Sequence, residues 1–230
     1  KFDHAGVPSI PEVLGALMAG RNPLIAYTVA DMAADAAALL DALGIARAHV
    51  VGASMGGMIV QHMAASHAGK VRTMTSIMST TGNRALPPSR PEAMAALMMP
   101  PPSLALEDVV QTGVARARAI GSPGYPAEEE RLRERIERDF RRSYHPAGMA
   151  RQFAAVVADG DRRAMLARVT VPTLVIHGED DPLVPVEGGH DTAASIPGAK
   201  LHLIPGMGHD VPLELVEEIA EAIAEHARAG

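Results

Sequence analysis

The chain has 230 residues, of which 47% are hydrophobic and 21% charged, as expected for an ordinary globular protein with one sizeable core. Its net charge of −6 at pH 7 comes without any basic cluster, which argues against a nucleic-acid-binding surface. No stretch approaches the roughly 18 uninterrupted apolar residues of a membrane-spanning helix. The absence of cysteine excludes disulfides, thiolate chemistry and cysteine metal sites.

The first part of the chain predicts two helices. Residues 1–27 are rich in proline and glycine, and they favour a short helix over residues 11–19 but no strand. Thr28, followed by Asp31, is typical of a capping box and predicts the start of a second helix. Apolar residues then recur at helical spacing, at Met32, Ala36, Leu39, Leu40 and Leu43. Gly44 supplies a natural helix stop at the C′ position.

Four short segments predict the strands of a sheet. They lie at residues 49–51, 71–79, 173–176 and 200–204, and helical patterns over residues 58–66 and 213–227 alternate with them. Strands that alternate with helices indicate a mostly parallel sheet flanked by helices. We expect residues 1–81 and 166–230 to form this α/β core.

The middle segment, residues 82–165, differs in character from the core. It is rich first in proline and then, from Glu128 to Arg142, in charge. Leu132, Ile136 and Phe140 recur every four residues within the charged run, which predicts a solvated helix with one inward face. We interpret the segment as a helical cap inserted over the sheet.

A G-x-S-x-G pattern stands between a predicted strand and a predicted helix, in the sequence Gly52-Ala53-Ser54-Met55-Gly56-Gly57. A serine on so sharp a turn has a strained backbone, and we expect side chains in place of these glycines to clash with adjacent elements. Ser54 is therefore a candidate nucleophile, and the Met55 N–H a candidate oxyanion donor at the helix N-terminus. Glycine-rich turns are also common before helices, where a serine can simply be a cap. The pattern alone leaves both interpretations open.

A cluster of acids follows the strand at 173–176. Residues beyond the carboxyl end of a parallel strand lie at the edge where such sheets bind ligands. We select Asp181 as the carboxylate that orients a histidine, since Pro182 fixes the backbone after it. Glu179 and Asp180 compete for this role, but we interpret them as capping or solvated acids.

His209 follows the strand at 200–204 and lies in a glycine-rich loop. A histidine there can accept the Ser54 proton while Asp181 holds its other nitrogen in the right tautomer. The chain order Ser, Asp, His is one of the orders used for this constellation. Each of the three residues follows a separate predicted strand, and chance is a poor explanation for that placement. We therefore predict a triad of Ser54, Asp181 and His209.

The remaining histidines have simpler interpretations. We expect most of them on the surface, namely His49, His62, His67, His145, His190, His202 and His226. His177 and the acids after it suggest a metal site, but the chain has no H-E-x-x-H pair, and consecutive acids on one loop cannot all face one ion. We therefore expect no metal.

The chain resembles the α/β-hydrolase superfamily, and most closely its small-molecule esterase branch, which includes aclacinomycin methylesterase-like enzymes. The resemblance rests on Gly-Ala-Ser-Met-Gly-Gly at 52–57, His-Gly-Glu-Asp-Asp-Pro-Leu-Val-Pro at 177–185 and Pro-Gly-Met-Gly-His at 205–209. It implies an α/β-hydrolase fold, the triad named above, no cofactor, and a helical cap that shapes the substrate pocket.

One departure from the family concerns the start of the chain. The family's sheet usually has eight strands with the nucleophile after the fifth, whereas here Ser54 follows the first of four predicted strands. The loop that gives the family its second oxyanion donor has no counterpart in residues 1–27. We therefore expect an N-terminally truncated fragment in which strand 49–51 becomes an exposed apolar edge that favours association, including homo-oligomers. Losing one oxyanion donor typically costs about 10²–10³ in turnover, so we expect the fragment to be impaired.

The leading functional interpretation is hydrolysis of a small-molecule carboxylic ester through an acyl-enzyme on Ser54. The methionines near the site could line an adaptable pocket or serve in ordinary packing; they are Met55, Met58, Met94, Met98 and Met99. The alternatives are an acyltransferase, a carbon–carbon bond hydrolase or a cofactor-free perhydrolase and, from another class, a catalytically silent binding protein or inactive fragment. A cytoplasmic location is the default expectation, with the alternative that a signal peptide preceded Lys1.

Overall fold

A computed structural model of the chain describes residues 3–230, in which the strands form one sheet of order β1-β2-β3-β4. The strands are β1 (Ala48–Ala53), β2 (Val71–Ile77), β3 (Thr173–Gly178) and β4 (Lys200–Ile204). Each neighbouring pair is parallel. The four predicted strands and their parallel arrangement are thus confirmed.

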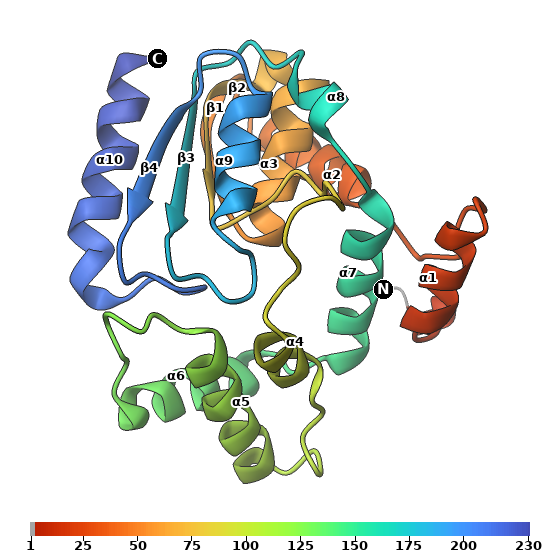
Figure 1. Cartoon of the computed structure of the whole chain (residues 1–230). Helices are drawn as coiled ribbons and strands as arrows, with labels where there is room; N and C mark the ends of the chain where they lie inside the picture. The colour runs from red at the N-terminus through yellow and green to blue at the C-terminus, as the bar shows by residue number, and fades with distance from the viewer. Residues whose placement is uncertain (1–2) are drawn as a thin grey trace.

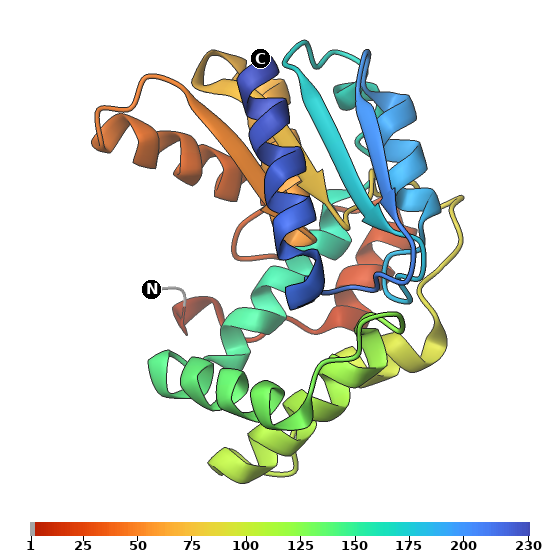
Figure 2. The same ribbon diagram turned by 90° about the vertical axis from the view of Figure 1, so that its left-hand side faces the viewer.

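Helices cover both faces of this sheet (Figures 1 and 2). On one face, α3 (Met55–Ser66) packs on β1 and β2, and α9 (Glu187–Ser195) packs on β3 and β4. On the other face lies α10 (Val216–Ala229), which follows the 3-10 turn η3 (Leu213–Leu215). α2 (Val29–Ala42) packs against α3, and the short turn η2 (Ala68–Lys70) links α3 to β2.

The core divides along these layers. One cluster joins α2 and α3 to β2 and includes Ala33, Val60, Met63, Val71, Met74 and Leu166. The second joins β3 and β4 to α10 and includes Leu174, Ile176, Ile204, Leu215 and Ile219. β3 is buried along its whole length, which explains why it contains a continuous apolar run rather than an alternating pattern.

The segment 82–165 contains α4 (Pro91–Met98), α5 (Leu106–Ile120), α6 (Glu129–Arg142) and α7 (Pro146–Asp159), and it leads into α8 (Arg163–Leu166). α8 therefore runs across the boundary that the sequence predicts at residue 165. The helices α4 to α7 of the segment lie beyond the carboxyl ends of the strands, and the chain then returns along the sheet to α8 (Figure 1).

The charged helix α6 has the inward face that its pattern predicts. Leu132 is buried, and Ile136 packs with it against α5. Gly113 of α5 lets Ile136 pack closely, because an added Cβ would lie 2.9 Å from Ile136 Cδ1 and this side chain would have to shift. Phe140 stacks at a tilt on Tyr144, with 5.0 Å between ring centroids.

Residues 3–27 hold the 3-10 turn η1 (Asp3–Ala5) and the predicted short helix, α1 (Ile10–Met18), which packs against α7. In this described stretch the chain forms no strand, as expected; Lys1 and Phe2 lie outside the described residues. Within residues 3–230, β1 pairs only with β2 and is an edge strand, and the Val51 side chain is 47% exposed. None of the helices described is both long and apolar enough to cross a membrane.

α2 begins and ends where the sequence indicates. Thr28 Oγ1 accepts a hydrogen bond from the Asp31 N–H at 3.0 Å, and Asp31 Oδ2 accepts one from the Thr28 N–H at 2.8 Å, which completes the capping box. The Thr28 hydrogen bonds lower the pKa of the Asp31 carboxyl. Gly44 terminates the helix with φ 68°.

The predicted apolar pattern of α2 is confirmed in part, since Met32, Ala36 and Leu40 pack against the core. Leu39 and Leu43 are 58% and 62% exposed, whereas Val29, Ala33 and Ala37 are buried. Small buried side chains at four-residue spacing allow α2 to lie close to α3, and Leu40 packs beside them.

Replacing Thr28 by alanine tests the start of α2. We expect Thr28→Ala to lower the free energy of unfolding by about 1 kcal/mol, because the Asp31 N–H loses its acceptor. Thr28→Ser keeps the hydroxyl and is the matched control, expected to stay within about 0.5 kcal/mol of the parent. Urea denaturation at pH 7 measures both, and equal losses in the two variants would contradict the capping role.

Candidate active site

Ser54 lies on the sharp turn between β1 and α3. Its backbone has φ 54° and ψ −117°, in the left-handed half of conformational space that non-glycine residues rarely adopt. The Ser54 N–H donates to the Ile77 carbonyl at 2.9 Å, which ties the turn to β2. Met55 begins α3, so its N–H lies in the first turn of that helix, where backbone donors are left without intrahelical acceptors.

The glycines around Ser54 have different roles. A Cβ on Gly52 would lie 2.0 Å from the Gly56 carbonyl oxygen, and one on Gly57 would lie 2.5 Å from Ser79 Cβ. Gly56 itself has open space where its Cβ would be, so the predicted clash is wrong at that position. The carbonyl of Gly56 makes the tight contact instead, because it lies where a side chain at position 52 would be.

His209 lies between the other two residues of the predicted triad. Its Nε2 is 2.9 Å from Ser54 Oγ, and its Nδ1 is 2.7 Å from Asp181 Oδ2. Because a carboxylate only accepts hydrogen bonds, we assign the proton to Nδ1, which leaves the Nε2 lone pair facing the serine hydroxyl. The structure thus brings all three predicted residues into one chain of hydrogen bonds.

Asp181 is buried and rigidly held. Its Oδ1 accepts the N–H groups of Leu183 and Val184 at 2.9 and 2.8 Å, which leaves Oδ2 to accept from His209. The competing acids point elsewhere, since Asp180 Oδ2 accepts the Gly206 N–H at 2.9 Å and Glu179 is exposed.

His177 supports the loop that holds Asp181. Its side chain is fully buried at the end of β3, and burial lowers the pKa of its imidazole, so the ring is neutral at pH 7. Its Nε2–H donates to the Val184 carbonyl at 2.8 Å, which secures the residue whose own N–H holds Asp181. Nδ1 is then the unprotonated nitrogen, and it has no hydrogen-bond partner in residues 3–230.

Sequence patterns did not indicate a role for Ser79. Its hydroxyl donates to the Ser54 carbonyl at 2.8 Å and so supports the strained turn from the end of β2. The available signal was its place directly after a strand, on the same sheet edge as the other site residues.

The segment 82–165 contacts both loops of the site. The His209 N–H donates to the Ile120 carbonyl at 2.7 Å, and the Gly208 N–H to Ser122 Oγ at 2.8 Å. At the start of the segment, the Arg90 N–H donates to the Pro182 carbonyl at 2.8 Å, next to Asp181. The helices therefore meet the site through backbone groups on either side of the triad.

Two histidines expected on the surface are not there. His226 is buried, with Nε2 3.2 Å from the Pro172 carbonyl, and the His62 side chain is only 12% exposed beside Asp159. Neither follows a strand, so the pattern that identified His209 could not single them out. Among the described residues, no three histidine, aspartate or glutamate side chains gather as a metal site would require.

A hollow of about 330 Å³ lies between the start of α6 and the loop after His209, and its lining includes Tyr125, Leu132 and Asp210. A larger one, of about 510 Å³, lies among residues 7–24, away from the triad. Neither hollow is lined by the methionines considered for a pocket. Met58 packs in the core, which fits the packing interpretation, whereas Met98 and Met99 are 46% and 55% exposed and belong to no core cluster among the described residues.

The fold and this constellation define an enzyme of the α/β-hydrolase class, and sequence comparison agrees. The family profile of the alpha/beta hydrolase fold matches residues 11–214, and the chain belongs to that family. Rhodomycin D methylesterase DauP of Streptomyces sp. strain C5 is 30% identical over 88% of this chain and 74% of its own length. A pimeloyl-[acyl-carrier protein] methyl ester esterase of Chromobacterium violaceum is 28% identical over 90% and 79%.

The structural comparison gives the same class. The crystal structure of a hydrolase from Pseudomonas aeruginosa PA01 superposes with a TM-score of 0.63 at 28% identity, covering 89% of this chain and 73% of that one.

Two alanine substitutions test the turn that carries Ser54. Gly52→Ala places a methyl group against the Gly56 carbonyl, and we expect it to lower the free energy of unfolding by about 3 kcal/mol. Gly56→Ala is the matched control, since its methyl group enters open space on a helix, and it should change stability by less than about 1 kcal/mol. Urea denaturation measures the free energy of unfolding of both variants. A Gly52→Ala variant as stable as Gly56→Ala would contradict the close contact between position 52 and the Gly56 carbonyl.

Proposed function

We propose that the chain hydrolyses carboxylic esters of small molecules through an acyl-enzyme formed on Ser54. The observation that carries this proposal is the position of His209, within hydrogen-bond distance of both Ser54 Oγ and Asp181 Oδ2. A serine hydroxyl is a weak nucleophile at neutral pH, and an adjacent imidazole of the right tautomer is what activates it.

The proposed reaction has two halves. Ser54 Oγ attacks the ester carbonyl carbon while His209 Nε2 takes the hydroxyl proton, and the tetrahedral intermediate collapses as the imidazolium returns that proton to the leaving alcohol. Water then attacks the acyl-enzyme with His209 as base again, releasing the carboxylic acid and restoring the Ser54 hydroxyl. The oxyanion of each intermediate accepts the Met55 N–H at the start of α3. No cofactor enters either half.

The surroundings of Asp181 suit the charge that develops on His209. The carboxylate is buried and already accepts two backbone N–H groups, so it does not reorganise when the imidazole becomes an imidazolium. A fixed dipole or charge aimed at a developing charge stabilises a transition state without a reorganisation cost. Neutral His177, which secures the Val184 carbonyl, adds no positive charge to compete for Asp181.

We assign the segment 82–165 as the cap over this site. Its helices lie beyond the carboxyl ends of the strands (Figure 1), and its backbone contacts the loops of Asp181 and His209. As substrate class we propose methyl esters of small carboxylic acids. The support is that both named sequence relatives are methyl ester esterases.

Neighbouring acids provide the test of this function. Asp181→Asn keeps the shape of the side chain but removes its negative charge, and its amide group can hold His209 in the wrong tautomer. We therefore expect ester turnover to fall by about 10⁴-fold. Asp180→Asn is the matched control, expected to cost less than about tenfold, because Asp180 contacts Gly206 rather than His209. Ser54→Ala should abolish turnover above background. Methyl ester hydrolysis measured by alcohol release gives all three rates, and equal losses at 180 and 181 would contradict the assignment.

A further inference from the structure

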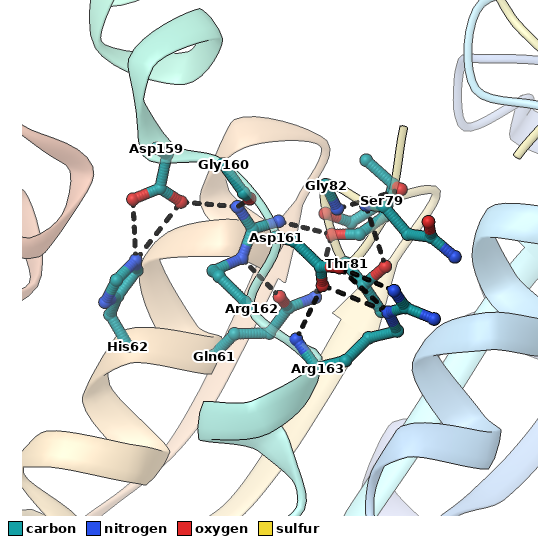
Figure 3. Close-up of polar contacts among 12 residues, drawn as sticks. Gln61, His62, Ser79, Thr81, Gly82, Asp159, Gly160, Asp161, Arg162 and Arg163 are labelled. Atoms are coloured by element: carbon teal, nitrogen blue, oxygen red, sulfur yellow. Dashed lines mark hydrogen bonds and ion pairs between the residues drawn. The ribbon is translucent and has the colours of Figure 1, made fainter. Parts of the chain in front are cut away.

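A buried arginine lies at the point where the segment 82–165 rejoins the core. The Arg162 side chain is 3% exposed, between α7 and α8. Its Nε donates to Gln61 Oε1 at 3.0 Å, and its other nitrogens donate to the Asp159 carboxylate and the Thr80 carbonyl (Figure 3). One guanidinium therefore contacts three different stretches of chain, and none of these contacts belongs to the triad.

Those three stretches are the two ends of the segment and the helix that carries Ser54. Asp159 is the last residue of α7, and its carboxylate also contacts His62 Nε2 of α3 at 2.9 Å. Thr80 lies on the outgoing connection, and Gln61 lies on α3 beside His62. Arg162 therefore links the departing and returning connections to α3, beside the direct contacts of His62 with Asp159 and of Gln61 with Thr80.

The backbones of the two connections also touch. The Arg162 N–H donates to the Thr81 carbonyl at 2.8 Å. A Cβ on Gly82 would lie 2.0 Å from the Gly160 carbonyl oxygen, so these connections pass each other at van der Waals distance. The crossing is therefore a defined joint, closed by Arg162 and by backbone contact.

The chemistry of this joint requires arginine. A buried cation is costly unless it is paired and its donors are satisfied. Burial lowers the pKa of the Arg162 guanidinium, and the Asp159 carboxylate opposes that shift and keeps the group charged. Only the planar fork of a guanidinium can reach a carboxylate, an amide oxygen and a carbonyl at once, whereas a lysine ammonium is a single point charge.

The joint is connected to the nucleophile turn by a short run of chain. Ser79, whose hydroxyl donates to the Ser54 carbonyl, directly precedes Thr80, whose carbonyl accepts from Arg162. Gln61 Nε2 also donates to the Thr80 carbonyl, at 3.4 Å. The same few residues therefore hold the turn that presents Ser54 and fix where the segment departs.

We propose that Arg162 is a positioning residue that fixes the cap relative to Ser54 and so limits which esters reach the nucleophile. It acts through Gln61, Thr80 and Asp159, and touches no reacting atom. This inference rests on the proposed esterase function. It predicts that loosening the joint changes substrate binding while the intrinsic reactivity of Ser54 stays the same.

The test compares Arg162→Met with Arg163→Met. Arg162→Met keeps a long side chain but removes its charge and all of its side-chain donors, while the backbone N–H to Thr81 remains. Arg163, the next residue along the chain, is the matched control, and its side chain pairs with Asp161 at the surface. Arg162→Lys keeps the charge for Asp159 but not the fork, and should fall between Arg162→Met and the parent. Each variant is assayed with a short-chain and a bulky p-nitrophenyl ester, for labelling by a small fluorophosphonate, and for amide hydrogen exchange.

We expect Arg162→Met to change KM for the bulky ester by about tenfold or more while kcat for the short ester and the labelling rate stay within about threefold. Amide exchange in residues 82–159 should quicken, with residues 166–230 unchanged, and Arg163→Met should match the parent throughout. Equal loss of kcat on both esters, or unchanged exchange in residues 82–159 of Arg162→Met, overturns the proposal. Failure of the parent itself to label would instead refute the esterase function, and the exchange experiment would still decide whether Arg162 holds the cap.

Discussion

The contact between Gly52 and the Gly56 carbonyl sets the geometry on which the site depends. Because a Cβ at 52 would lie 2.0 Å from that oxygen, β1 and α3 can approach so closely only with glycine there. The approach forces Ser54 into positive φ and lifts its hydroxyl from the turn towards His209. Bonds from Ser54 N–H to the Ile77 carbonyl and from the Ser79 hydroxyl to the Ser54 carbonyl hold this strained residue in place.

The parallel sheet supplies the rest of the geometry. Its strands end at one edge, so loops far apart in sequence deliver Ser54, Asp181 and His209 to the same place. Each loop is then secured locally, with Asp181 held by two backbone N–H groups and the His209 N–H held by the Ile120 carbonyl. The rigidity of the site therefore depends on backbone bonds that involve the helical segment as well as the sheet.

Sequence patterns located the features with strong local signals, and they missed those that depend on tertiary contacts. The Thr28 capping box, the strand runs and the residues after each strand could all be identified by spacing. The exposure of Leu39 could not, since it depends on how closely α2 lies against α3. The clash expected for a side chain at Gly56 was wrong, because the close contact there is made by the Gly56 carbonyl oxygen and limits residue 52. Arg162 gave no signal at all, because an arginine within a polar stretch looks solvated until three distant segments close around it.

The most direct test of the proposed mechanism is to trap the acyl-enzyme intermediate. A p-nitrophenyl ester is mixed with the protein, the reaction is quenched in acid within milliseconds to seconds, and peptides are mapped by mass spectrometry. We expect one acyl adduct, on the peptide that contains Ser54, and none in Ser54→Ala. Ester turnover with no adduct on Ser54, or with the adduct on another residue, would contradict it.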